Sequence, residues 1–100
     1  MKEQNIGKRV IIRSEGAGVF FGTLVRRDGR ECELMDARRI WKWDGAASLS
    51  ELAAAGTAKP RDCRFPAPVE SIEVFNLLEV IPCTEQAAAS IESVPVWSAR

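Results

Sequence analysis

Residues 8–36 read KRVIIR, SEGA, GVFFGTLVR, RDGR and ECELMD in succession, and this pattern predicts three antiparallel strands joined by two turns. Residues 8–13 and 18–26 are rich in β-branched and aromatic side chains, and a glycine-containing turn segment separates them. An Asp-Gly pair at positions 28 and 29, between two strand-like runs, is the strongest short-range hairpin signal. We therefore expect residues 31–36 to return antiparallel to residues 18–26.

Gly22 lies inside the second of these runs, where a missing side chain usually marks a bulge or the sharp bend of a small barrel. Residues 37–44 (ARRIWKWD) predict a fourth strand. Its side chains would alternate between two sides, with Arg39, Trp41 and Trp43 on one and Arg38, Ile40 and Lys42 on the other.

Two helices are expected further along the chain. Ser48 and Glu51 form a capping box, with the Ser48 hydroxyl accepting the Glu51 N–H and the Glu51 carboxylate reaching back to the Ser48 N–H. This box starts a short helix over residues 49–55, and Gly56 ends it. Residues 57–68 predict a surface loop, residues 69–82 favour one strand, and Thr84 caps a final helix over residues 85–93.

The predicted elements show no βαβ alternation. Their order is four strands, a short helix, a loop, a strand and a helix. The prediction is therefore an α+β fold, mostly antiparallel β-sheet or a small half-open barrel, with one short central helix and one C-terminal helix. We expect residues 1–100 to form a single domain.

Composition excludes several kinds of site. The chain has no histidine, so neither a Ser-His-Asp triad nor a mixed Cys/His zinc site can form. The three cysteines, Cys32, Cys63 and Cys83, lack a C-x-x-C pair and are expected to act as small apolar residues. We expect no enzyme activity, no cofactor and no metal.

No apolar run approaches the roughly 20 residues that span a bilayer, and no signal-peptide core follows the N-terminal residues Met1-Lys2-Glu3-Gln4-Asn5. The expected location is the cytoplasm of a host bacterial cell, with no membrane partner. Net charge is zero, but residues 1–64 carry +4 and residues 65–100 carry −4. Nucleic-acid-binding domains are usually strongly basic, so nucleic acid is the less favoured partner.

The predicted binding surface centres on the segment from Arg38 to Trp43. Trp41, Trp43 and Arg39 could stack on a base and pair with a phosphate, as in nucleotide and single-strand binding surfaces. The same rings could instead be core, with Arg39 at its edge, or they could form a subunit interface, since Trp and Arg are interface hot-spot residues.

Two further segments are candidates for anion contacts. Asp44, Gly45 and Ser48 precede a helix, whose free N–H groups could face a phosphate, although a plain helix cap explains them equally. Arg26, Arg27 and Arg30 surround the predicted hairpin tip. The tip is either solvated or, in a homo-oligomer, part of an anion pocket that several copies build together with Arg39.

Three segments resemble a family of small, uncharacterised phage and prophage proteins: residues 17–24 (AGVFFGTL), residues 37–53 (ARRIWKWDGAASLSELA) and residues 81–92 with IPCTE and SIE. The resemblance covers nearly the whole chain and implies a phage or prophage origin, without a catalytic role to transfer. A weaker similarity links the bent strand with Gly22-Thr23-Leu24 to Sm-like barrels, as a shape only.

Together these features predict a non-catalytic, phage-encoded binding protein. The leading hypothesis is an oligomeric sponge that sequesters a nucleotide second messenger of bacterial immunity, so the expected partners are a nucleotide-like small molecule and further copies of the chain. The alternatives are a module that binds and inhibits or recruits a host or phage protein, and a small barrel that binds RNA or single-stranded DNA.

Overall fold

The computed structural model describes residues 4–99 of the 100-residue chain. Residues 1–3 of the N-terminal segment 1–5, which the signal-peptide expectation named, lie outside this range. The elements follow in the order β1 (Arg9–Ser14), β2 (Gly18–Asp28), β3 (Glu31–Arg39), α1 (Leu49–Ala55), a 3₁₀ turn (Pro60–Asp62), β4 (Val69–Val74), β5 (Leu77–Pro82) and α2 (Glu85–Ser93). The fold is α+β, as predicted.

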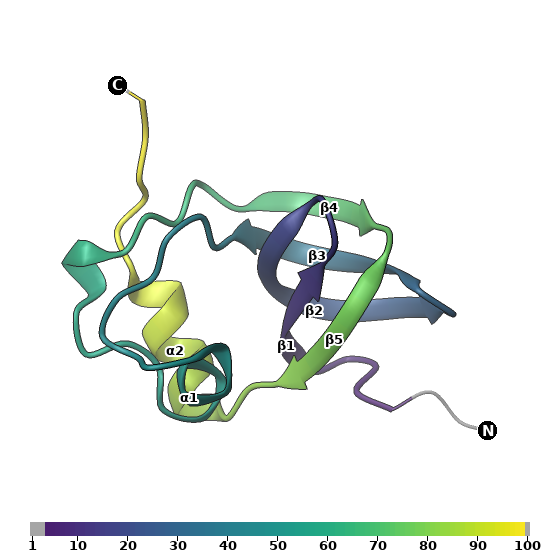
Figure 1. Ribbon diagram of the computed structural model, residues 1–100, viewed down its shortest axis with the longest axis horizontal. Coiled ribbons are helices and arrows are strands. Elements are labelled where there is room, and N and C mark those ends of the chain that lie inside the picture. The colour runs from purple at the N-terminus through teal and green to yellow at the C-terminus, as the bar shows by residue number, and fades with distance from the viewer. Residues whose placement is uncertain (1–3, 100) are drawn as a thin grey trace.

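The five strands form one antiparallel sheet in the order β4-β3-β2-β1-β5 (Figure 1). β4 and β5 lie at opposite edges of the sheet, yet only Phe75 and Asn76 connect them. Two residues cannot span a flat five-stranded sheet, because neighbouring strands lie about 4.8 Å apart. The sheet therefore curls until its two edges approach each other, which makes it the half-open barrel that the sequence predicts.

Gly22 allows the close approach that this curl requires. The pairing register of β2 with β3 shifts between Phe21 and Thr23. A Cβ atom on Gly22 would lie 3.1 Å from both the Cα of Ala37 and the carbonyl oxygen of Met35. The pairing is thus irregular at Gly22, as expected, although the extra residue lies on β3 opposite it.

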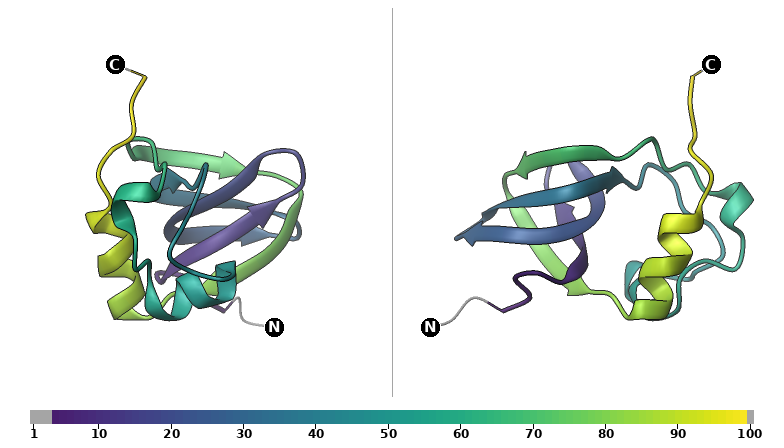
Figure 2. Two further views of the ribbon diagram at one scale, coloured as in Figure 1. Left: turned by 60° about the vertical axis from the view of Figure 1, so that its left-hand side comes forward. Right: turned by 180° about the vertical axis from the view of Figure 1, so that it is seen from behind.

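Each face of the sheet contributes side chains to a separate core. The interior of the barrel is filled by side chains from all five strands, namely Val10, Ile12, Phe20, Leu24, Cys32, Leu34, Ala37, Val74 and Leu77. The outer face carries Ile11 and Phe21, which pack against α1, α2 and the loop between β3 and β4. Both helices lie at the same end of the barrel, away from the β2–β3 hairpin tip (Figure 1, Figure 2).

The predicted helices form with their predicted caps. Ser48 Oγ accepts a hydrogen bond from the Glu51 backbone N–H at 3.1 Å, and Gly56 ends α1 with φ of 80°. The Glu51 carboxylate accepts the Ala47 N–H, one residue before the predicted partner Ser48. Thr84 caps α2 by accepting the Ala87 N–H. No helix among residues 4–99 is long and apolar enough to cross a membrane.

The predicted fourth strand over residues 37–44 is wrong. β3 continues to Arg39, because Asp36 adopts a left-handed conformation with φ of 50° and lets the strand pass an irregularity in its pairing. Beyond Ile40 the chain leaves the sheet, and only an isolated bridge joins Lys42 to Arg64. Trp41 and Trp43 therefore do not share a strand face with Arg39.

The single strand predicted over residues 69–82 is likewise wrong, because the structure divides it into β4 and β5. Asn76 has φ of 60°, a conformation that Asn adopts more readily than most residues. It turns the chain between two edge strands: β4 pairs with β3, and β5 pairs with β1.

Candidate functional site

Three short segments meet beside the barrel and hold an exposed aromatic cluster. Residues 64–65 lie between residues 41–42 and residues 96–97. The Arg64 carbonyl accepts the Trp41 N–H at 3.1 Å, and the Phe65 carbonyl accepts the Trp97 N–H at 3.0 Å. These backbone contacts bring Trp41 and Trp97, which lie more than 50 positions apart in the sequence, to the same surface.

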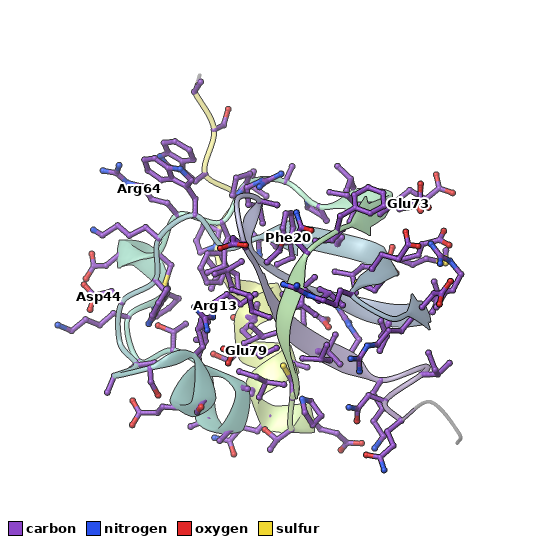
Figure 3. The ribbon with its side chains drawn as sticks, turned by 45° about the vertical axis from the view of Figure 1, so that its right-hand side comes forward. Arg13, Phe20, Asp44, Arg64, Glu73 and Glu79 are labelled. Carbon is purple, nitrogen blue, oxygen red and sulfur yellow. The ribbon has the colours of Figure 1, made fainter. Side chains whose placement is uncertain are left out.

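Trp41 and Trp97 stack on each other in this cluster. Their ring centroids lie 4.9 Å apart and their planes differ by 5°. The Arg64 guanidinium carbon lies 5.6 Å from the Trp41 ring and 5.5 Å from the Trp97 ring, so it sits beside the pair and covers neither outer face. Figure 3 shows Arg64 next to the stacked rings, at the far end of the molecule from Glu73. We call Trp41, Trp97 and Arg64 the tryptophan platform.

The tryptophan platform is exposed and bordered by positive charge. Trp41 is 57% exposed and Trp97 is 40% exposed, although burial of such large rings is strongly favourable. Lys42 lies beside it and is exposed too. Of the ion pairs found between residues 4 and 99, none involves Arg64 or Lys42. Both cations are thus available to a ligand that stacks on the rings.

Trp43, by contrast, belongs mainly to the scaffold. Its indole is half-buried against the outer core, and its Nε1 donates a hydrogen bond to the Ala46 carbonyl at 3.2 Å. The two tryptophans predicted to act together therefore have different environments, and only Trp41 lies in the tryptophan platform.

Arg38 is a buried structural tie. Its guanidinium donates to the carbonyl oxygens of Pro66, Ile91 and Phe65 at 3.0 to 3.1 Å, which joins β3 to the following loop and to α2. Burial lowers the pKa of this guanidinium. Arg39, one residue later, is exposed, lies over the Phe20 ring at 4.4 Å and donates to the Ala17 carbonyl at 2.7 Å.

The segment before α1 folds onto itself. Asp44 accepts the Gly45 N–H, and the Asp44 carbonyl accepts the Thr57 hydroxyl. Gly45 has φ of 80°, and a Cβ atom there would lie 2.4 Å from the Lys59 backbone nitrogen. Since the Glu51 carboxylate already occupies an N–H at the start of α1, the geometry gives no further support to the phosphate site predicted at Asp44, Gly45 and Ser48.

Arg26 and Arg27 lie at the β2–β3 hairpin tip. Arg39 of β3 pairs with Phe20, near the other end of β2. Arg26 forms an ion pair with Glu73 at 3.1 Å, and Arg27 Nε donates to the Gly29 carbonyl. One copy of the chain therefore does not bring these two arginines to the tryptophan platform.

Arg64 and Trp97 were not predicted as site residues. An apolar tail at Val96 and Trp97 is visible in the sequence, but no local pattern pairs it with Trp41. Within residues 4–99, no group of three or more Cys, Asp or Glu side chains is placed to hold a metal ion.

Comparison with known families settles the relationship of the chain. A family model described as a domain of unknown function (DUF6948) matches residues 7–91. The chain belongs to this family. Trp41 and Arg64 lie within the DUF6948 match, and Trp97 follows it. Searches of curated proteins and of solved structures found no match.

Proposed function

We propose that this protein binds a nucleotide on the tryptophan platform without chemically changing it. The observation that carries the proposal is the exposed, parallel Trp41–Trp97 stack with Arg64 beside it. Indole faces bind nucleobases by stacking, and Arg binds phosphate oxygens through paired N–H groups. Lys42 supplies a second cation at the same surface.

Charge favours a small nucleotide over a long strand. A protein that follows a nucleic-acid backbone needs many cations along a continuous path. Here the net charge is zero, and residues 65–100 contain five glutamates and one arginine. The tryptophan platform therefore fits a ligand with one or two bases and few phosphates.

The biological role we propose is sequestration. The resemblance of residues 37–53 to small phage and prophage proteins supports a phage or prophage origin, and the absence of histidine agrees with binding without turnover. Under this proposal, a homo-oligomer in the host cytoplasm withholds a nucleotide second messenger of bacterial immunity.

A second candidate is a protein-interaction module, because Trp and Arg are the residue types that dominate interface energies. Val96 supports it, since this side chain is 55% exposed beside the tryptophan platform and adds apolar area. A side chain of the partner protein would then pack on the tryptophan platform in place of the nucleobase.

Isothermal titration calorimetry tests the proposal with a defined panel: AMP, ADP-ribose, cyclic di- and trinucleotides, and a short oligothymidylate. We expect saturable binding of at least one small nucleotide. Trp41→Ala and Trp97→Ala should each weaken it by about 1–3 kcal/mol, the usual loss for one stacked base. Trp43→Phe is the matched control, because Trp43 lies outside the platform and should leave the affinity unchanged.

Three results would overturn the proposal. No binding across the panel would leave the protein-interaction module as the better candidate. Binding that resists both Trp41→Ala and Trp97→Ala would place the ligand elsewhere. Tight binding of oligothymidylate alone, with a steep loss on adding salt, would assign the platform to single-stranded nucleic acid instead.

A further inference from the structure

A recess lies on the barrel wall, next to the tryptophan platform, which it adjoins at Val96. It has a volume of about 420 Å³, within the range of small-molecule sites. β1, β2, β3 and the segment after α2 contribute to its lining. Its apolar part consists of Phe21, Pro68, Val94 and Val96.

Four charged side chains also line this recess: Arg9, Asp36, Arg38 and Glu92. Arg9 lies over the Phe21 ring, with its guanidinium carbon 4.4 Å from the ring centroid. Its Nη1 donates to the Glu92 carboxylate. Its Nε, in contrast, is buried and has no hydrogen-bond partner. The Arg9–Glu92 pair therefore uses only part of the hydrogen-bonding capacity of the guanidinium.

The Arg9–Glu92 ion pair is also weak enough for a ligand to displace Glu92. The Arg9 side chain is 29% exposed and the Glu92 side chain 49% exposed. Ion pairs with this degree of exposure contribute only about 0–1 kcal/mol to stability. A ligand carboxylate that takes the place of Glu92 on Nη1 exchanges one exposed ion pair for another charge-assisted contact, and the apolar walls of the recess add contacts that Glu92 does not make.

The charges favour a monoanion over a dianion. The four charged side chains of the lining sum to zero, and Glu92 keeps its charge on α2 when it is displaced. A monoanion therefore adds less repulsion at this recess than a phosphate dianion does. The apolar walls beside Arg9 suit a hydrocarbon chain.

We propose that this recess binds a monocarboxylate with an apolar chain, whose carboxylate replaces Glu92 on Arg9. Such a group is supplied either by a free fatty acid or by the C-terminus of a peptide that ends in an apolar residue. The site shares no residue with the tryptophan platform and does not depend on the proposed nucleotide function.

Titration of the full chain by NMR tests the proposal with five probes: octanoate, octanamide, a tetrapeptide ending in leucine with a free carboxylate, its C-terminal amide, and inorganic phosphate. We expect octanoate or the free peptide to bind at residues around Arg9, and the neutral amide of that probe to bind at least tenfold more weakly. Which of the two carboxylates binds more tightly identifies the source.

Substitutions give two opposite effects. Glu92→Gln removes the internal competitor and should tighten binding by about threefold to fivefold, in line with the weak exposed pair. Arg9→Gln should weaken it about tenfold or more, because a charge-assisted hydrogen bond is lost. Arg13→Gln and Glu79→Gln are the matched controls, since this pair also joins a β1 arginine to a glutamate and lies outside the recess.

Circular dichroism of Arg9→Gln separates a lost ligand contact from a lost fold, and the gain from Glu92→Gln is independent of that variant. The proposal is overturned if the amides bind as well as the carboxylates, if inorganic phosphate binds more tightly than both, or if Glu92→Gln leaves the affinity unchanged. Nucleotide binding that persists in Arg9→Gln would confirm that the two sites are separate.

Discussion

Arg38 and Arg39 show how neighbouring residues of one type serve different purposes. Arg38 is 5% exposed and donates to three carbonyl groups, whereas Arg39 is exposed and donates to one. Simple alternation separates the two but does not say which of them is buried. That choice depends on the left-handed Asp36, which shifts the register of β3.

This difference predicts the stability of two variants. Arg38→Met should lower the free energy of unfolding by about 3 kcal/mol or more, because three carbonyl groups lose a charged donor. Arg39→Met should lower it by less than about 1 kcal/mol, because one exposed hydrogen bond is lost. Urea denaturation measures both, and equal losses would show that Arg38 is not the tie described here.

Cys83 predicts a loss of stability at alkaline pH. Burial raises the pKa of its thiol to about 11, although Arg9 opposes the shift. An unfolded chain ionises this thiol from about pH 8.5, whereas the folded chain keeps it neutral. As pH rises from about 8.5 to about 11, ionisation of this thiol stabilises the unfolded state. The free energy of unfolding therefore falls over this pH range.

Urea midpoints at pH 7 and pH 10 measure this effect. The wild-type midpoint should fall more than that of Cys83→Ala, which has no thiol to ionise. An identical fall in both proteins would show that the Cys83 thiol is not responsible.

At the scale of elements, local signals predicted the hairpins and both helices. Turn residues, the capping serine and threonine, and the glycine at the bend act within a few positions, so one sequence reveals them. The division between β4 and β5 depends on Asn76, a signal that the apolar run around it masked. The course of residues 40–44 depends on pairing with Arg64, which no local pattern predicts.

Thr84 links the two helices and predicts a measurable cap effect. Its hydroxyl accepts the Ala87 N–H at 3.0 Å and donates to the Ala54 carbonyl at 2.8 Å, which joins the start of α2 to the end of α1. Thr84→Ala should lower the free energy of unfolding by about 1–2 kcal/mol. Ser93→Ala is the control, because the Ser93 hydroxyl contacts only its own helix. A loss of similar size in thermal denaturation of both variants would contradict the cap's role.

At the scale of the whole molecule, the binding surface arises only when distant segments meet. Sequence predicted Trp41 as a contact residue but paired it with Trp43, two positions away. The fold instead places Trp97 on Trp41 and Arg64 beside both. Such a cluster depends on the course of the loop before β4 and of the segment after α2, which tertiary packing determines.

The three indole N–H resonances test the nucleotide platform most directly, because the chain contains only Trp41, Trp43 and Trp97. Two-dimensional ¹H–¹⁵N spectra recorded during titration with ADP-ribose and with a cyclic dinucleotide would follow all three at once. We predict that at least one of these nucleotides shifts the Trp41 and Trp97 signals in a saturable way and leaves Trp43 in place. Shifts confined to Trp43, or three unmoved signals with every nucleotide, would contradict the account.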